Sequence, residues 1–446
     1  MRFYLAFYIA RLAAWVIRRV ARDRGTNLPG EIALRIDPDF VSHIKGVDPS
    51  KAVFITGTNG KSTSTNLIHH ILSHSGCSVC SNLKGANLLA GVATALMEDC
   101  SLSGRLKKDY IVMETDERYL RFIRRQLPAK YLCVTNIQKD QAQRNGEPSF
   151  IRNKIAQVLD GSVTLFVNHD EPNAYSLRDL AGRTVSYGAD ENSCSFRKDD
   201  DFFAVSVPCP CCHNPVEFQA YNIDNIGPFR CPVCGFGEGE ADYVARDVDF
   251  EGKRFSVDGH DYAFHFNTAY FLYCYVLAVG VATELGIPRE KIAAALEQFD
   301  DIRGLVETRE LAGKQLHYIK IKQENSETLQ SALNLTATDP HEKDLLIYHT
   351  EFIDLFPPYA NSFYFYDCDF RGVLRSGVGK WVCMCQTLSR AIATRFLYDG
   401  YDEKHMILLP DSREETIRSV MESMHTEDAY LIAELTYWKT WGGGNL

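Results

Sequence analysis

The chain has 446 residues, of which 45% are hydrophobic and 24% are charged, and its formal net charge is -10. The length favours two or three domains over a single core, and the composition is that of an ordinary globular protein. The acidic balance excludes a general nucleic-acid binder, which carries a basic excess. The 14 cysteines, without secretory features, indicate a reducing compartment in which some thiols bind metal.

Residues 3–17 are apolar and aromatic, interrupted by Arg11 and followed by a cluster of arginines at 18–24. This segment is too short for a membrane span of about 20 residues, and it lacks the cleavage site of a signal peptide. Two interpretations stay open: an amphipathic helix on a membrane surface, or a helix packed on the protein itself or on a partner. Residues 28–30 and 37–38 predict turns.

The most informative stretch follows at residues 51–63. An apolar strand at 53–55 leads into Gly57-Thr58-Asn59-Gly60-Lys61-Ser62-Thr63, a glycine-bearing turn that opens a helix. Glycines let the backbone approach an anion, a lysine here reaches the β- and γ-phosphates, and a serine hydroxyl ligates Mg²⁺. A general P-loop has a further glycine where this chain has Ile55, so the fit is to a variant. The stretch predicts an ATP-binding loop.

Strands and helices alternate beyond this loop, with predicted strands at 110–113, 131–134 and 163–167 and a helix at 119–127. Such alternation predicts a mostly parallel sheet covered by helices, with ligands at the carboxyl ends of the strands. Glu114 ends one strand and is best placed to hold Mg²⁺ together with Ser62. Its neighbours Asp116 and Glu117 could instead form a solvated charge cluster. Asn136 and Asp170 also follow strands.

Two cysteine pairs, Cys209-x-x-Cys212 and Cys231-x-x-Cys234, interrupt the alternation at about 190–262. Their spacing matches a four-cysteine zinc ribbon, in which four thiolates close the coordination sphere and the metal is structural. Cys211 and His213 are not expected to bind.

Helical spacing returns at 269–285 and 288–299, and a second alternating region follows. Its predicted strands lie at 345–348, 364–367 and 406–409, and its predicted helices at 391–397 and 414–424 with Asp411 and Ser412 as N-caps. We therefore expect three parts: an N-terminal helix and linker (1–45), an ATP-binding domain with the ribbon inserted (46–300), and a C-terminal domain (301–446).

These features resemble the Mur ligases, which join an amine to a carboxylate through an acyl phosphate. The loop at 57–63 is similar to the ATP loop of that family. The four-cysteine insertion is typical of its MurT-type subfamily, the ligase-like subunits of lipid II isoglutaminyl synthase. Further matching segments lie at 28–30, 82, 85–88, 114–117, 135–147, 266–270, 366–370 and 435–437.

The resemblance implies an α/β fold, with a Mur-ligase-like central ATPase domain, a parallel sheet, an inserted zinc ribbon and a smaller Rossmann-like C-terminal domain. It implies ATP-dependent amidation of the D-glutamate carboxylate of lipid II, with ammonia from a separate glutaminase subunit in a heterodimer. ATP, Mg²⁺ and Zn²⁺ are the implied cofactors. The protein is expected in the cytoplasm, in peripheral contact with the inner face of the membrane.

The resemblance also assigns site residues. Lys61 and Glu114 are the expected catalytic groups of the nucleotide half, and Asn267 lies in the stretch that resembles the adenine contact. The family's Gly-Arg-x-Glu element is changed at 304–307, where Arg303 is the neighbouring arginine that could bind the cofactor.

Two further residues belong to the expected coupling with the glutaminase. In the family, an aspartate that assists the partner's glutaminase centre precedes the segment that matches residues 366–370. Its position corresponds to Asn361 in this chain, and Asp354 is the closest upstream acid. The family's Lys-Asn-Pro segment is also absent, and residues 319–325 are its nearest counterpart.

Two other functions stay open at this point. One is a stand-alone Mur-like ligase that uses an amino acid or another amine. The other is a degenerate, non-catalytic ATP-binding partner, which the changed C-terminal motifs favour and the intact Lys61, Ser62 and Glu114 oppose.

Overall fold

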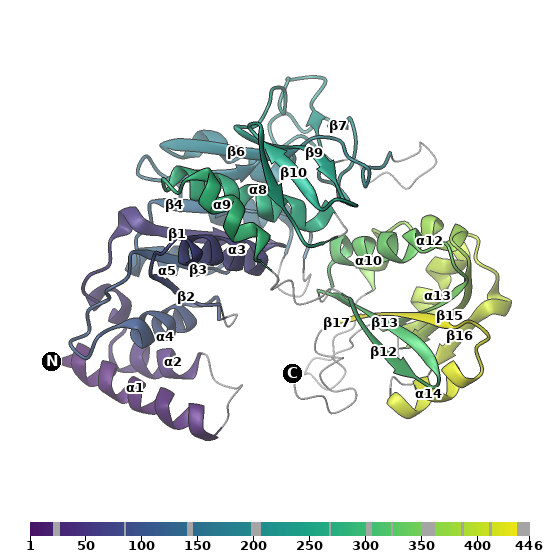
Figure 1. Ribbon diagram of the computed structural model, residues 1–446, viewed down its shortest axis with the longest axis horizontal. Helices are drawn as coiled ribbons and strands as arrows, with labels where there is room; N and C mark the ends of the chain where they lie inside the picture. Colours follow the sequence, from purple (N-terminus) through teal and green to yellow (C-terminus); the bar gives the residue numbers. More distant parts are fainter. Residues whose placement is uncertain are drawn as a thin grey trace. The chain divides into compact units, whose positions relative to one another are not determined.

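The computed structural model describes residues 1–20, 27–83, 86–140, 146–197, 207–266, 269–299, 306–322, 324–348, 362–384, 388–409 and 413–434. The chain forms two compact units. The first is built from Met1–Gln138, Glu147–Arg197 and Ser206–Asp301, and the second mainly from Ile302–Leu446. Each unit has its own sheet (Figure 1).

The first unit contains a nine-stranded sheet in the order β11-β10-β9-β6-β5-β4-β1-β3-β2. All neighbours from β2 to β9 pair in parallel, and the β9-β10-β11 end is antiparallel. The strands are β1 (Ala52–Thr56), β2 (Val79–Ser81), β3 (Tyr110–Glu114), β4 (Tyr131–Val134), β5 (Thr164–Asn168), β6 (Arg183–Ala189), β9 (Tyr243–Asp249), β10 (Arg254–Val257) and β11 (His260–Ala263). The predicted parallel α/β sheet is confirmed.

Helices cover both faces of this sheet, which explains why β1 is buried along its whole length. Alternate side chains such as Phe54 and Met113 pack in one large core with α4 (Leu89–Asp99), α5 (Leu120–Gln126) and α6 (Pro148–Ala156). On the opposite face α3 (Lys61–His74) packs against α8 (Ala269–Glu284) and α9 (Arg289–Glu297). The short α7 (Pro172–Tyr175) follows β5.

The N-terminal segment is a helix, α1 (Arg2–Val20), that packs on α2 (Leu28–Ile36), which in turn packs on α4 (Figure 1). The turn predicted at 28–30 is wrong. Pro29 and Gly30 form the first turn of α2, because proline fits the start of a helix where its missing N–H has no partner to lose. Gly30 packs so closely on Ala90 of α4 that a Cβ would lie 1.8 Å from that carbonyl oxygen.

A small two-stranded antiparallel sheet, β7 (Glu217–Phe218) and β8 (Phe229–Arg230), lies between β6 and β9 in the sequence. The paired cysteines lie before β7 and directly after β8 in the sequence. A separate apolar cluster supports this ribbon, in which Val216, Phe229 and Phe236 pack against the buried Cys209 and Cys231.

The second unit has a six-stranded sheet in the order β12-β13-β17-β14-β15-β16, parallel except for the edge strand β12. Its strands are β12 (Val306–Leu311), β13 (Lys314–Ile321), β14 (Lys343–Tyr348), β15 (Val378–Met384), β16 (Met406–Leu409) and β17 (Asp428–Glu434). Its helices are α10 (Ser326–Thr338), α11 (Phe363–Tyr366), α12 (Arg371–Arg375), α13 (Ser389–Tyr398) and α14 (Glu414–Glu422). Two core clusters, one on each face, complete a second α/β layer structure.

One predicted strand of this unit is wrong. Residues 364–367 belong largely to α11, a single helical turn whose Tyr364 and Phe365 are fully buried. A short apolar aromatic run fits a buried helix or a buried strand equally well, so its sequence alone did not discriminate between them. The N-cap residue of α14 is Arg413, while the predicted caps Asp411 and Ser412 lie outside the described residues.

Candidate functional site

The predicted phosphate loop joins the carboxyl end of β1 to the first turn of α3. Gly57 and Gly60 have φ values of 126° and 79°, a region that favours glycine. A Cβ on Gly57 would lie 2.3 Å from the Thr135 hydroxyl oxygen, and one on Gly60 would lie 2.9 Å from Cys274 Sγ. The first backbone N–H groups of α3 have no partner within the helix, so this end suits an anion.

The segment that follows β4 holds the loop in place. The Asn136 side chain accepts a hydrogen bond from the Asn59 N–H at 2.9 Å and donates to the Asn59 carbonyl at 3.2 Å. The Thr58 N–H donates to the Asn136 carbonyl at 2.9 Å, and its hydroxyl exchanges hydrogen bonds with the backbone of Gln138. In the described structure, Asn136 is therefore a buried support of the loop backbone.

Ser62 and Glu114 meet beside the loop. The Ser62 hydroxyl donates to Glu114 Oε2 at 2.7 Å, and Asn87 donates to Oε1 at 3.2 Å. The Asn82 side chain bonds both the N–H and the carbonyl of Glu114 at 2.8 Å, which fixes the end of β3. A hydroxyl and a carboxylate at this position offer two oxygen ligands of the kind that Mg²⁺ prefers.

Lys61 lies folded against the loop. Its Nζ donates to the carbonyls of Gly57 and Thr58 and forms an ion pair with Glu117 Oε2 at 3.4 Å. Glu117 also pairs with Arg118 at 3.0 Å, and both Asp116 and Glu117 are buried. The interpretation of these two acids as a solvated charge cluster is wrong. They follow the carboxyl end of β3 and are buried there. Sequence reasoning missed Glu117 as the partner of Lys61.

A buried carboxylate, Glu171, ties this region together. It accepts backbone N–H groups from Ile137 at 2.9 Å and from Asn173 and Ala174 at 3.0 and 2.8 Å. Burial raises the pKa of Glu171 to about 7, opposed by those three N–H donors. The residue caps α7 and, through Ile137, anchors the segment that supports the predicted phosphate loop.

A polar cavity of 470 Å³ lies where β5 and β6 end beside the ribbon. Asp170 lines it and accepts hydrogen bonds from the Ala189 N–H and the Tyr273 hydroxyl, both at 2.8 Å. Tyr273 belongs to α8, so Asp170 connects that helix to β6. The sequence predicted a polar group at this strand end but gave no sign of its partners.

The remaining predicted site residues separate into two groups. Thr63 lies in the first turn of α3 with Lys61 and Ser62. The other four, Asn267, Arg303, Asp354 and Asn361, lie outside the described residues.

The segment that stands where the family has Lys-Asn-Pro is described in the second unit, with which Asp140 also groups. Lys322 Nζ donates to Asp140 Oδ2 at 2.6 Å, and Asn325 Nδ2 donates to Oδ1 at 3.4 Å. The side-chain oxygen of Asn325 caps α10 by accepting a hydrogen bond from the Thr328 N–H at 2.9 Å. The replaced motif thus still supplies a lysine and an asparagine to one buried acid.

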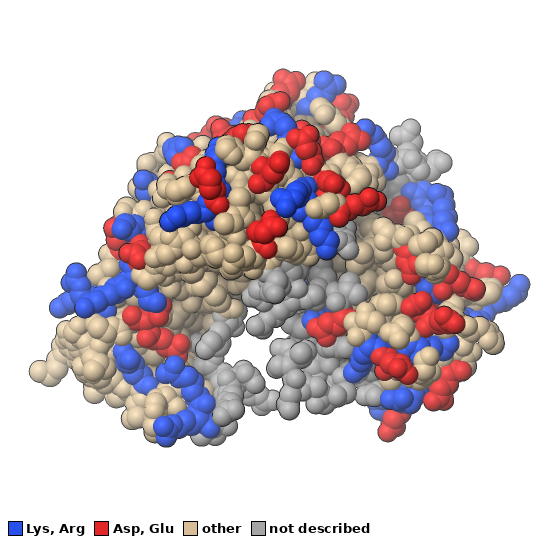
Figure 2. All heavy atoms as spheres, viewed as in Figure 1, with Lys and Arg blue, Asp and Glu red and all other residues tan. Residues whose placement is uncertain are grey.

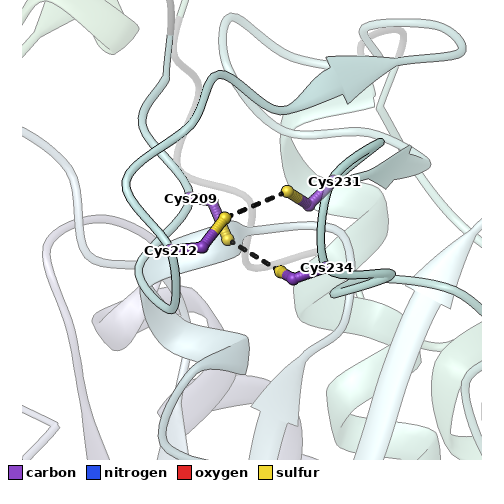
Figure 3. Close-up of side chains that lie close together, drawn as sticks. All are labelled: Cys209, Cys212, Cys231 and Cys234. Atoms are coloured by element: carbon purple, nitrogen blue, oxygen red, sulfur yellow. Dashed lines mark hydrogen bonds between the residues drawn. The ribbon is translucent and has the colours of Figure 1, made fainter.

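The four predicted zinc ligands come together in the ribbon (Figure 3). Their sulfur atoms all lie within 4.8 Å of one another, with Cys209 Sγ 3.7 Å from Cys234 Sγ and Cys212 Sγ 3.5 Å from Cys231 Sγ. A tetrahedral ion with Zn–S bonds of about 2.3 Å requires sulfurs about 3.8 Å apart. This cluster is therefore consistent with zinc, and the exposed Cys211 is not part of it.

Nearby donors favour the thiolate form at one ligand. The Asn214 side chain donates to Cys212 Sγ at 3.5 Å, and this contact leads the causes that lower the pKa of Cys212 to about 6. Burial raises the pKa of Cys209 to about 12. A coordinating metal ion removes such a proton outright, so these pKa shifts describe the metal-free ribbon.

Comparisons with known proteins agree with this geometry. Residues 55–215 match the Mur ligase middle domain. The chain is 29% identical over 307 residues to the MurT subunit of lipid II isoglutaminyl synthase (glutamine-hydrolyzing) from Staphylococcus aureus, covering 68% of each chain. It is 24% identical over 437 residues to the MurT subunit from Streptococcus pneumoniae, covering 97% of this chain and 94% of that protein.

Two solved structures share the fold. A pseudomurein peptide ligase type C from Methanothermus fervidus superposes with a TM-score of 0.69 and 19% identity, covering 90% of this chain and 80% of that one. MurF from Acinetobacter baumannii gives a TM-score of 0.63 at 14% identity, covering 92% and 78%. At such identities the likeness concerns the fold alone.

The parallel sheet, the glycine loop and the Ser62–Glu114 pair define the class: the chain is an ATP-dependent ligase whose residues 55–215 match the Mur ligase middle domain. It is MurT-like, as the similarity along nearly its whole length and the four-cysteine cluster show.

Proposed function

We propose that this chain is the amidating subunit that converts the D-glutamate carboxylate of a lipid II-type peptidoglycan precursor into an amide, using ATP and ammonia. The observation that carries the proposal is the Ser62–Glu114 contact of 2.7 Å beside the Lys61–Glu117 pair. These groups stand in a chain that aligns with a MurT subunit over 97% of its length.

In this proposal the loop at 57–63 holds the triphosphate, and Ser62 and Glu114 hold Mg²⁺. Lys61 exchanges its present carbonyl partners for phosphate oxygens, which are stronger acceptors. Its charge then stabilises the phosphoryl group during transfer. Asn136 acts as a positioning residue because it fixes the backbone of Asn59. Asn267 and Arg303 are proposed as further nucleotide contacts.

The reaction proceeds in two steps. A carboxylate oxygen of the substrate attacks the γ-phosphorus, so that the bond to the β–γ bridging oxygen breaks and ADP leaves. Ammonia then attacks the acyl carbon, the C–O bond to phosphate breaks, and the amide loses a proton to solvent. The chain's part is to hold the phosphates, neutralise their charge and exclude water from the activated acyl group.

The source of ammonia is proposed to be a separate glutaminase subunit in a heterodimer. The names of the similar MurT subunits describe a glutamine-hydrolyzing synthase. Asp354 and Asn361 are the residues we propose for coupling to that partner. Zinc is proposed to fill the four-cysteine cluster and to stabilise the ribbon without entering the reaction.

The lipid-linked substrate places the protein in the cytoplasm at the inner face of the membrane in this proposal. Among the described residues, no helix has the length and apolarity needed to cross a bilayer. A peripheral contact is therefore the form of membrane association that we propose.

The decisive experiment measures ATP hydrolysis and amide formation with a lipid II-type muropeptide, with and without a co-expressed glutaminase subunit. We expect hydrolysis to require the muropeptide, and amidation from glutamine to require both subunits. Amidation from added ammonium should need this chain alone. Turnover with a free amino acid in place of ammonia would favour a stand-alone ligase, and no ATP turnover under any condition would favour a non-catalytic partner.

A further inference from the structure

Helix α1 presents two different faces. Its inner face, with Ala6, Phe7, Ala10 and Ala14, is buried against α2 and the large hydrophobic core of the first unit. Alanines four residues apart leave a flat stripe that lets α2 approach closely. The helix is thus packed on the protein itself, as one of the two interpretations of the sequence expected.

The outer face of α1 is also apolar, although it is exposed. The exposed residues recur with helical spacing and form one stripe along the helix: Tyr4, Leu5, Tyr8, Ile9, Leu12, Trp15 and Val16. Leu12 is 62% exposed and Trp15 48% exposed. Leu102, 69% exposed, extends this stripe because the Tyr8 hydroxyl donates to its carbonyl at 2.9 Å. A helix on an ordinary aqueous surface carries polar residues here.

The charge of α1 is opposite to that of the whole chain. The helix contains Arg2, Arg11, Arg18 and Arg19 and no acidic residue, whereas the chain has a formal net charge of -10. Arg18 and Arg19 lie in its last turn, and the Arg19 guanidinium lies 3.9 Å over the Trp15 ring. Figure 2 shows uncharged atoms with basic side chains gathered beside them in the region of α1 and α2.

We propose that this outer face docks the protein on the surface of an anionic lipid bilayer, with α1 lying in the plane of the interface. The leucines and isoleucine enter the acyl boundary, the tryptophan and tyrosines lie at the headgroup level, and the arginines contact lipid phosphates. Because the inner face is already buried on α2, only this orientation remains available to α1.

A second copy of the chain is a poorer occupant of the same face. A symmetric contact through α1 would bring two sets of arginines together without an acidic residue of either helix between them. Bilayer docking instead brings lipid phosphates to Arg19 and to Arg18, which also pairs with Glu98 at 3.7 Å. Docking through α1 specifies the surface and the lipid charge for the membrane contact of the proposed function. The biological purpose of docking rests on that function, but docking itself requires no catalysis.

The test is sedimentation of the full chain with vesicles of phosphatidylcholine alone or with about 30% phosphatidylglycerol, at low and high salt. We expect binding to the anionic vesicles that weakens with salt. The double variant Leu12→Glu/Val16→Glu should lower the partition coefficient at least about tenfold. Arg18→Glu/Arg19→Glu should lower binding to anionic vesicles and remove its salt dependence.

A matched control uses two exposed apolar residues of α13 in the second unit, Leu397 and Tyr398. The variant Leu397→Glu/Tyr398→Glu adds the same charge and should bind like the parent. Equal vesicle binding by the parent and the α1 variant would overturn the inference, as would binding indifferent to lipid charge. So would a dimer of the parent that α1 substitution dissociates without any vesicle binding. ATP turnover with a water-soluble muropeptide tests the proposed function separately, since it should survive α1 substitution.

Discussion

At the scale of single residues, the site depends on contacts between strand ends that are distant in the sequence. Ser62 reaches Glu114, and Lys61 reaches Glu117, because β1 and β3 are neighbours in the sheet. The motif predicted the lysine and the hydroxyl. It did not identify Glu117, since an acid after a strand is as common on a solvated surface as in a site.

Replacement of Lys61 should separate catalysis from folding. Lys61→Ala removes a charge from the proposed phosphate site and should lower ATP turnover at least about 100-fold, while circular dichroism and the thermal midpoint stay close to those of the parent. Lys51→Ala is the matched control, because Lys51 is exposed before β1 and should leave turnover unchanged. Normal turnover in the Lys61 variant would remove the phosphate role of this loop.

At the scale of elements, the conformation of the loop between β1 and α3 requires two glycines, which have positive φ and little room for a Cβ. Gly57→Ala would force a positive φ on alanine and place its Cβ against the Thr135 hydroxyl. We expect a loss of more than about 2 kcal/mol in the free energy of unfolding and loss of nucleotide binding.

Gly76 offers the matched control for that substitution. It has a φ of 93°, yet nothing lies within 4 Å of a Cβ built on it. Gly76→Ala should therefore cost only the backbone strain, about 1 kcal/mol, and retain nucleotide binding. Urea unfolding with a fluorescent ATP analogue measures both quantities. Equal costs for the two variants would show that crowding at Gly57 is unimportant.

The ribbon should depend on metal as an element. Its apolar cluster is small, so we expect a bound ion to supply much of its stability. Metal analysis should find about one zinc per chain, and Cys231→Ser should lower both zinc content and the thermal midpoint. Cys211→Ser, at an exposed cysteine outside the cluster, should change neither. A zinc content below about half an equivalent in chelator-free protein would contradict the assignment.

At the scale of the whole molecule, Glu171 should contribute to the pH dependence of stability. Its pKa rises from 4.5 to about 7 on folding, so the folded protein keeps a proton that the unfolded chain releases. This stabilisation is complete below pH 4.5 and is lost as pH rises toward 7, by up to about 3 kcal/mol. Urea unfolding at pH 5 and pH 7.5 should show a smaller decline for Glu171→Gln than for the parent. An identical decline would mean that Glu171 ionises normally.

Much of the architecture could be predicted because it follows from local patterns. Short runs of apolar residues that alternate with helical patterns predicted the parallel sheet of each unit. The paired cysteines announced the ribbon. The prediction failed at 28–30, where proline opens a helix and not a turn, and at 364–367, where a buried aromatic run is helical. At 28–30 a proline suits the first turn of a helix as well as a turn, and at 364–367 an apolar run suits a buried helix as well as a buried strand.

The sequence by itself determined the glycine turn between β1 and α3, the clustering of the four cysteines and the α/β class, because each is a local pattern that depends on spacing along the chain. Only the tertiary structure decided which acids meet that loop, how Asn136 and Glu171 support it, and which face of α1 is left outside. Those features depend on strand order and helix packing, and residues brought together across a sheet carry no signature of their pairing in a single sequence.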